Sequence, residues 1–303
     1  MAERLKLNKL TKTPPFRKIA MGTWRTAKDP TVYGYAEIDM TEVNKHLPEY
    51  QRKHDVKITP AHLVGKAVAY CLNKNPELNG MLRFNKVYLR ENVALFFQVN
   101  VPGTGKNKVK KANLSGTTIY KAENLSVAEI SKALKQKSSE LREDHGKALN
   151  KSLAVFKYIP WWLVGKFLDF MSFIIYGLRI NLSKFGFPQD PFGSVMITNV
   201  GSLGIDIAWA PLCPYTRVPI LFTVGSVNPK PVAINDKDIE VHQILPVSMT
   251  FDHRFIDGAH AAKLSEEFKN CFAEPEKFLF DQPTTTTSTS EHNDPIPLAA
   301  KSE

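Results

Sequence analysis

The chain has 303 residues, of which 43% are hydrophobic and 23% charged, a composition typical of a globular protein with a sizeable core. Its formal net charge is +10 and its pI is near 9.3, which favours nucleic acid, an anionic membrane surface or a polyphosphate ligand as partner, although a solvated basic surface explains the charge equally well. The three cysteines, Cys71, Cys213 and Cys271, match no metal-binding spacing and indicate free thiols in a reducing compartment, which argues against a disulfide scaffold.

The N-terminal segment is basic and lacks the apolar core of a secretory signal peptide. We therefore expect residues 1–11 to be a flexible tail and the protein to be cytoplasmic. Alternation of apolar and polar residues predicts a strand over 31–43 that leads into a helix. Residues 58–79 predict an amphipathic helix, with Thr59 as its N-cap and Pro60 in its first turn.

The middle of the chain continues this α/β pattern. Residues 86–101 predict two strands, the second of which is apolar on both faces and therefore central in a sheet. The segment 102–116 is rich in glycine and lysine but lacks the spacing of a phosphate-binding loop, so we interpret it as a hairpin loop. Residues 126–149 predict a charged helix.

Residues 153–179 form the most apolar stretch in the chain. Lys166 and Asp169 interrupt it, and a membrane-spanning helix does not carry central charges, so we exclude a transmembrane segment. We expect a helical hairpin that is buried or packs between subunits. A helix lying in the plane of a membrane surface remains the alternative, because tryptophans and flanking cations suit that interface.

The C-terminal part alternates strands and turns before a final helix. Residues 193–214 predict a strand followed by a glycine turn, 218–235 a strand followed by a proline-rich turn, and 238–253 two strands. The final helix is expected over 257–279. Residues 281–303 are polar and of low complexity, which predicts a disordered tail.

The sequence SMTFDHRFIDGA (248–259) breaks an apolar strand with several ionisable groups. Histidine is the side chain most easily poised as a base near neutral pH, so His253 is a candidate general base. Asp257, four residues later, would orient it or pair with an arginine. Gly258 permits backbone geometry that other residues resist. A histidine near an aspartate is more often structural than catalytic, so the context of the motif decides its meaning.

That context strongly resembles the catalytic domain of the 2-oxoacid dehydrogenase acyltransferases, relatives of chloramphenicol acetyltransferase that share an H-x-x-x-D-G motif. Further segments resemble the same family: FRKIAMGTW (16–24), ITPAHLVGKAVAYCLNKNPELNG (58–80), MITNVGSLG (196–204) and VPILFTVGSV (218–227). The resemblance covers residues 12–280, with an apolar helical insertion at about 145–190 as its one large departure.

The resemblance implies an α/β (α+β) fold, a chloramphenicol acetyltransferase-like two-layer sandwich with a mixed central sheet and helices packed on it, assembled as a homotrimer. It implies coenzyme A or acyl-CoA as a co-substrate and an acyl acceptor of unknown identity, with no covalently bound cofactor and no metal. No lipoyl or subunit-binding module is recognisable before residue 12, so we expect a catalytic domain that stands alone as a free trimer.

The resemblance also assigns roles to residues. His253 would remove a proton from the acceptor, and Thr198 would stabilise the oxyanion, although Thr198 could equally be an ordinary strand residue. Asp257 would pair with Arg17, and Gly258 would support the site. Asp252 and Arg254 belong to the motif but receive no chemical role. Lysines in the glycine-rich loop are weak candidates for binding coenzyme A phosphates or lipid headgroups, and are more often a solvated hairpin tip: Lys106, Lys108, Lys110 and Lys111.

Three functions follow from these observations. The leading hypothesis is a coenzyme A-dependent acyltransferase acting on a small or lipid-like acceptor. The alternatives are a non-catalytic trimeric scaffold of the same fold, and the acyltransferase component of a 2-oxoacid dehydrogenase complex that uses a lipoyl domain on another chain. We expect no nucleic-acid partner, because no recognised motif accompanies the basic charge. Peripheral membrane contact through 153–179 stays open.

Overall fold

The computed structural model describes residues 29–84, 86–101, 113–143, 159–180 and 190–280. The chain divides into two units, Met1–Pro30 and Thr31–Glu303, and the architecture below is that of the second. Its strands are β1 (Thr31–Asp39), β2 (Gly80–Arg83), β3 (Lys86–Leu89), β4 (Ala94–Val101), β5 (Asn113–Tyr120), β6 (Val195–Asn199), β7 (Ile220–Val224), β8 (Asn228–Ala233) and β9 (Ile239–Asp252). Its longer helices are α2 (Thr41–His54), α3 (Pro60–Lys74), α4 (Val127–Glu143), α6 (Trp161–Ser172) and α7 (Gly258–Ala273), and η3 (Phe173–Gly177) and η7 (Glu276–Phe280) are π-helical turns.

Seven of the described strands form one mixed sheet in the order β1-β9-β7-β6-β4-β5, and β8 pairs with the N-terminal part of β9. Strands β4, β6 and β7 are mutually parallel, whereas β1, β5 and β8 pair antiparallel with their neighbours. Strand β4 lies between β5 and β6, which confirms the prediction that this doubly apolar strand is central. Strands β2 and β3 form a separate hairpin.

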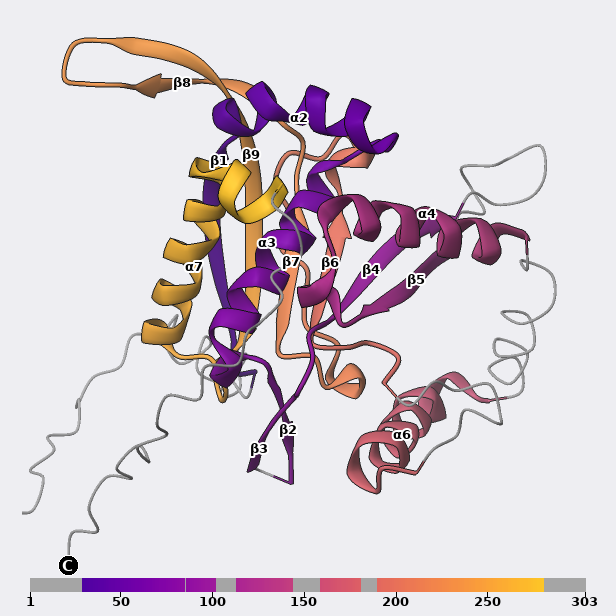
Figure 1. Cartoon of the computed structure of the whole chain (residues 1–303). Helices are drawn as coiled ribbons and strands as arrows, with labels where there is room; N and C mark the ends of the chain where they lie inside the picture. The colour runs from indigo at the N-terminus through magenta and orange to yellow at the C-terminus, as the bar shows by residue number, and fades with distance from the viewer. Residues whose placement is uncertain (1–28, 85, 102–112, 144–158, 181–189, 281–303) are drawn as a thin grey trace, which may run out of the picture. The chain divides into compact units, whose positions relative to one another are not determined.

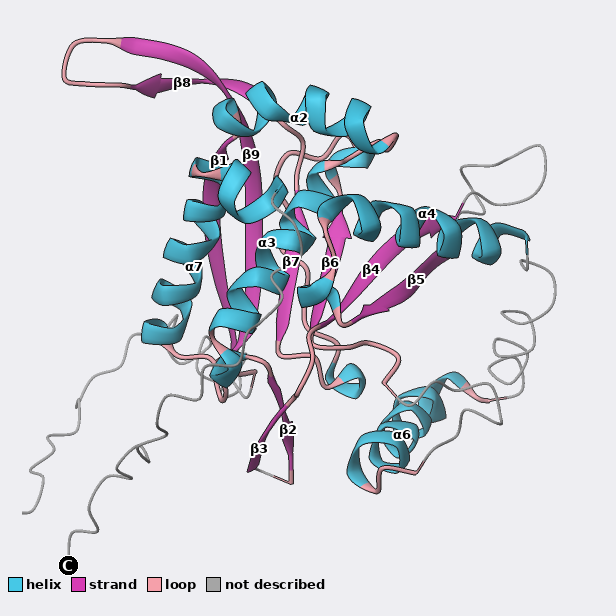
Figure 2. Cartoon of the chain, in the orientation of Figure 1, coloured by secondary structure: helices cyan, strands magenta, loops and turns pink. Residues whose placement is uncertain are grey.

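Helices α2, α3, α4 and α7 cover one face of the sheet (Figure 1), and Figure 2 distinguishes this helical layer from the strands by colour. Helix α3 is buried along most of its length. Phe268 of α7 packs on Phe222 of β7, with ring centroids 5.3 Å apart, and both side chains are fully buried. Burying these large side chains between helix and sheet supplies much of the hydrophobic stabilisation. The mixed sheet with packed helices confirms the predicted sandwich.

The opposite face of the sheet carries polar and exposed aromatic side chains. Thr250 of β9 donates a hydrogen bond to the carbonyl of Ala210 at 2.8 Å, which fixes part of the loop after β6 over this face. Tyr35 of β1 contacts Trp209 of the same loop, with ring centroids 6.4 Å apart, yet 40% of Tyr35 and 53% of Trp209 remain exposed. This chain alone therefore leaves apolar surface uncovered on this face.

Several strands differ from the prediction. Residues 238–253 form the single strand β9 rather than two strands, and the proline-rich segment after β7 is the strand β8 rather than a turn. Pro229 and Pro231 are tolerated because β8 is an edge strand that pairs only with β9. Proline has no amide hydrogen, and on the open side of an edge strand there is no neighbouring carbonyl that needs one. Strands β2 and β5 were not predicted, because β2 is short and the first residues of β5, 113–116, belong to the segment interpreted as a hairpin loop.

The apolar segment contributes helix α6 and the π-helical turn η3 within residues 159–180. Arg217 donates from Nε to the hydroxyl of Ser172 at 3.0 Å, and Arg83 donates from Nε to the carbonyl of Gly177 at 2.9 Å. These contacts attach the segment to the body of the domain and to the β2–β3 hairpin. Among the described residues, no helix is both long and apolar enough to cross a bilayer.

The start of α3 depends on an uncharged histidine. The amide of Thr59 donates to Nδ1 of His62 at 3.2 Å, so the neutral ring carries its proton on Nε2. Only 8% of His62 is exposed, and burial lowers its pKa to about 4. Protonation would place a charge in the core and remove the acceptor that holds the Thr59 amide.

We predict that His62 makes the domain acid-sensitive. Between the ordinary histidine pKa of about 6.5 and the folded value of about 4, the unfolded chain binds the proton and the folded chain does not. Stability is therefore complete above this window and falls with pH inside it. From pH 7 to pH 4, urea unfolding should show the wild type losing up to about 3 kcal/mol more than His62→Gln. Equal losses would contradict the prediction.

Candidate active site

His253 lies in a tight turn between β9 and α7. The amides of Phe255 and Ile256 both donate to the carbonyl of Asp252 at 2.9 Å, which closes the turn. The amide of Asp252 in turn donates to the carbonyl of Pro219 at 2.9 Å, just before β7. The turn is thereby anchored to two strands, and His253 is held at the edge of the sheet where β9 ends.

The ring of His253 has a defined tautomer. Its Nδ1 lies 2.8 Å from the carbonyl oxygen of Ile256. A carbonyl oxygen only accepts hydrogen bonds, so the neutral ring donates from Nδ1 and keeps a lone pair on Nε2. The side chain is exposed, which leaves Nε2 accessible. The arrangement gives His253 the geometry of a general base.

Asp252 and Arg254 stabilise the same turn. Arg254 donates to both carboxylate oxygens of Asp252, at 2.9 Å from Nε and 2.6 Å from an Nη atom, and its backbone amide donates to the same carboxylate at 3.1 Å. A two-point arginine–carboxylate pair fixes orientation as well as distance. The two motif residues that had no chemical role in the sequence thus hold the backbone on either side of His253.

Asp257 is the N-cap of α7. Its carboxylate accepts from the backbone amide of His260 at 2.9 Å, and its own amide donates to Nδ1 of His260 at 3.4 Å, which completes a capping box. The hydrogen bond from the His260 amide lowers the pKa of Asp257, so the carboxylate is charged at neutral pH. Its expected partner, Arg17, lies outside the described residues.

Gly258 is the first residue of α7 and does not adopt a positive φ. A β-carbon at this position would contact nothing within 4 Å. The expectation that Gly258 provides a backbone geometry closed to other residues is therefore wrong within this chain.

Thr198 lies on β6, on the sheet face opposite the helices. Its neighbours Val195 and Ile197 point into the helical core, so the alternation of the strand directs Thr198 to the other side. In register with it lie Thr223 of β7 and, next to that, Ser248 of β9, which form a row of hydroxyl side chains across three strands. The hydroxyl of Thr223 is buried without a hydrogen-bond partner among the described residues.

The chain does not bring Thr198 and His253 together. Two strand-to-strand steps separate Thr198 from Ser248, and five residues along β9 separate Ser248 from His253. At about 4.8 Å per step and about 3.3 Å per residue, the two α-carbons lie roughly 19 Å apart. A proton acceptor and an oxyanion donor must both touch the reacting carbonyl group, so one chain alone does not supply both.

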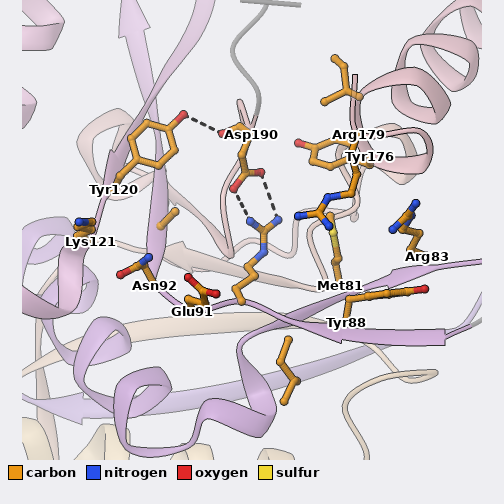
Figure 3. A pocket seen from close by; sticks show the side chains of 14 residues that line it. Met81, Arg83, Tyr88, Glu91, Asn92, Tyr120, Lys121, Tyr176, Arg179 and Asp190 are labelled. Carbon is orange, nitrogen blue, oxygen red and sulfur yellow. Dashed lines mark hydrogen bonds and ion pairs between the residues drawn. The ribbon is translucent and has the colours of Figure 1, made fainter. Parts of the chain in front are cut away.

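The lysine candidates for coenzyme A binding, Lys106, Lys108, Lys110 and Lys111, lie outside the described residues. The structure instead contains a cavity of about 600 Å³ that the sequence did not predict. It lies between the β2–β3 hairpin, the end of β5 and the turn η3 (Figure 3). An ion pair between Arg90 and Asp190 crosses it, and the hydroxyl of Tyr120 donates to the Asp190 carbonyl at 2.8 Å. These residues are far apart in sequence, so no local sequence pattern predicts the cavity.

The family described as 2-oxoacid dehydrogenases acyltransferase (catalytic domain) matches residues 10–150 and 189–280. The matched residues make up most of the chain and include Thr198, His253 and Asp257. Residues 151–188, which include α6 and η3, are not matched.

Individual proteins agree with this match. The dihydrolipoyllysine-residue acetyltransferase component of the pyruvate dehydrogenase complex from Mycoplasma capricolum is 25% identical over 247 residues, which cover 80% of this chain and 45% of that protein. The chain thus spans less than half the length of this relative.

A probable dihydrolipoamide acetyltransferase from Listeria monocytogenes has a TM-score of 0.55 at 18% identity, covering 92% of this chain and 98% of that one. A truncated catalytic core of the 2-oxoacid dehydrogenase multienzyme complex from Thermoplasma acidophilum has a TM-score of 0.54 at 19% identity, covering 88% and 99%. The predicted fold is confirmed.

Proposed function

The chain belongs to the catalytic-domain family of the 2-oxoacid dehydrogenase acyltransferases, and from that premise we propose that it transfers an acyl group between a coenzyme A thioester and an acceptor, without a covalent enzyme intermediate. The observation that carries the proposal is the ring of His253. Its Nδ1 donates to the Ile256 carbonyl at 2.8 Å, which leaves the Nε2 lone pair available as a base on an exposed side chain. Coenzyme A is a co-substrate in this reaction, and no covalently bound cofactor takes part.

The proposed reaction proceeds in two steps. Nε2 of His253 takes the proton from an acceptor thiol, hydroxyl or amine as that group attacks the thioester carbonyl carbon. The carbonyl π electrons move onto oxygen, and the Thr198 hydroxyl donates a hydrogen bond to this oxyanion, which stabilises the transition state more than the substrate. The intermediate then expels the coenzyme A thiolate, which takes the proton back from His253.

We propose that each site is assembled from two chains of a homotrimer. The separation of roughly 19 Å within one chain supports a site in which Thr198 meets the His253 of another copy. Exposed apolar side chains on the sheet face that carries Thr198 offer a surface for that association, and more than a third of each is accessible: Tyr33, Tyr35, Ile205, Ile207 and Trp209. Asp257 would support the site, with Arg17 as its expected ion-pair partner.

The acceptor is the least defined part of the proposal. Several relatives are named for acetyl or succinyl transfer involving a dihydrolipoyllysine residue. A dihydrolipoyl thiol, carried by another protein or by another part of the same one, is therefore the first acceptor to test. A small or lipid-like acceptor is the second, because the apolar segment before β6 precedes the strand that bears Thr198.

Replacing the base should abolish transfer. We predict that His253→Ala lowers thiol release from acyl-CoA thioesters by about 10²- to 10⁴-fold, with dihydrolipoamide or lipid acceptors present, because no other group removes the proton. The assay follows free thiol across a panel of acyl chain lengths. His46→Ala, on α2, removes a histidine outside the motif and should keep wild-type turnover. Absence of release by the wild type with every thioester would favour the scaffold reading.

Two inactive variants should complement each other. Thr198→Ala and His253→Ala each destroy one half of the site, but a mixed trimer can place an intact His253 beside an intact Thr198. Co-expression at equal amounts should restore about a quarter of wild-type turnover, since that fraction of interfaces joins the two intact partners at random. Turnover no higher than that of the separate variants, in a sample shown to contain mixed oligomers, would refute a shared site.

We also propose peripheral membrane contact through α6 and η3. Trp162, Phe170 and Phe173 follow one another along one side of this segment, and between 41% and 60% of each is exposed. Phe173 packs edge-on against Phe84 at the tip of the β2–β3 hairpin, at 6.1 Å between centroids. Lys166 and Asp169 lie on the same side of the helix and offset each other, so attraction to an anionic interface would come from the net charge of +10 of the whole chain.

Co-sedimentation with vesicles tests this contact. We predict binding to vesicles containing phosphatidylserine and weaker binding to phosphatidylcholine alone, because apolar insertion and anionic headgroups act together. The double variant Trp162→Ser/Phe170→Ser should lose the binding. Val241→Ser, at an exposed position of β9, is the matched control and should retain it. Equal vesicle binding by both variants would show that α6 and η3 do not form the membrane contact.

A further inference from the structure

The cavity between the β2–β3 hairpin and η3 contains none of the residues that the proposed function uses (Figure 3). We propose that it binds a small amphipathic anion, a carboxylate or phosphate carried by an aromatic or short apolar body. Its volume of about 600 Å³ lies within the usual range for a small-molecule site. This inference goes beyond acyl transfer and does not depend on it.

The charge of the cavity favours an anion. Four cationic side chains and two carboxylates line it, which leaves a formal excess of two positive charges: Arg83, Arg90, Lys121 and Arg179 against Glu91 and Asp190. Arg90 and Asp190 neutralise each other. Within the described part of the chain, Arg83 and Arg179 form no ion pair. In Figure 3 these two arginines and Tyr176 lie on one side of the Arg90–Asp190 pair, so positive charge is concentrated there.

The same side offers an apolar surface beside the charge. Met81, Tyr88 and Ile175 line it. The guanidinium of Arg83 lies 5.2 Å from the ring centroid of Tyr88, and its Nε is held by the Gly177 carbonyl at 2.9 Å. The guanidinium is therefore oriented before any ligand arrives, which reduces the entropy lost on binding. A ligand with an apolar body and one acidic group matches both features.

Tyr176 supplies an unpaired hydrogen-bonding group. The residue is 7% exposed, and its hydroxyl is buried beside the Asp190 carboxylate and the Phe192 backbone, without a hydrogen bond of standard geometry to any described residue. Buried hydroxyls are usually paired, because an unpaired one has lost its hydrogen bonds to water without replacement. Burial, and next the neighbouring Asp190 carboxylate, raise the pKa of Tyr176, so it remains a neutral donor. An anionic oxygen in the cavity would accept from it.

The backbone around the cavity is held in uncommon conformations. Lys121 and Arg179 have backbone φ values of 54° and 58°, which residues other than glycine rarely adopt. Tyr176 belongs to a π-helical turn, and both features concentrate at functional sites. Tyr176 and Arg179 also lie in 151–188, the segment that the family does not match. The shared acyltransferase fold therefore does not account for this wall of the cavity.

Isothermal titration with three related probes tests the proposal: 3-phenylpropionate, phenyl phosphate and 3-phenylpropan-1-ol. We expect both anions to bind the wild type, and the uncharged alcohol to bind at least about tenfold more weakly, because only an anion gains charge-assisted hydrogen bonds. The ratio between the two anions distinguishes a carboxylate ligand from a phosphate ligand. Equal binding of the alcohol, or no binding of any probe at millimolar concentration, overturns the proposal.

Two variants localise the binding. Arg179→Asn removes the charge while asparagine tolerates the positive φ, and should weaken anion binding by about tenfold or more. Tyr176→Phe should weaken it by about fivefold without lowering the Tm of the unliganded protein, since it removes only an unpaired hydroxyl. Lys237→Asn, in the exposed turn between β8 and β9, makes the same charge change elsewhere and should bind like wild type. Unchanged anion affinity in Arg179→Asn refutes the site.

Discussion

Strand β9 hydrogen-bonds to β1 and β7 over its C-terminal half and to β8 over its N-terminal half, and the geometry of the candidate active site depends on this continuous pairing. A fully paired strand cannot slip by one residue without turning its buried side chains toward the other face. The register therefore determines that β9 ends at Asp252, next to Pro219, with His253 in the following turn. The motif is chemically useful because the sheet holds it in one place.

The same register keeps the two candidate catalytic groups apart. Thr198 lies at the β6 end of the row of hydroxyl side chains that crosses β7 to Ser248 of β9, whereas His253 lies beyond the C-terminal end of β9. No side-chain rearrangement bridges a separation of roughly 19 Å. The proposed site, shared between two chains, would make association a requirement for the chemistry. The exposed aromatic surface near Tyr35 and Trp209 lies on the sheet face that carries Thr198, and it is available for this association.

The apolar segment combines two unrelated properties. On one side, α6 exposes Trp162 and Phe170, which form the apolar surface of the proposed membrane contact. On the other, η3 is held by Arg83 and directs Tyr176 and Arg179 into a positively charged cavity. Since the family does not match these residues, both properties distinguish this chain from the shared fold. The cavity places its charges and its apolar surface side by side, which favours ligands that have both.

Much of the fold was determined by local patterns in the sequence. The presence of a helix after β1, the Pro60 start of α3 and the central position of β4 follow from periodicity, capping and composition, which depend on neighbouring residues only. The H-x-x-x-D-G sequence likewise identified His253 and Asp257, because a strand-to-helix turn is local. Patterns of this range could not show that β9 is one strand, because its second half is supported by partners far along the chain.

Only the tertiary structure decided how the functional groups are placed. It separated Thr198 from His253, gave Asp252 and Arg254 their role in the turn, and closed the cavity through an ion pair between Arg90 and Asp190, one hundred positions apart. The hydrogen-bond partner of His253 Nδ1 also became visible only in the folded turn. The physical reason is that the sequence specifies the chemistry of each side chain, whereas the distances and directions between side chains depend on how the backbone folds into the sheet.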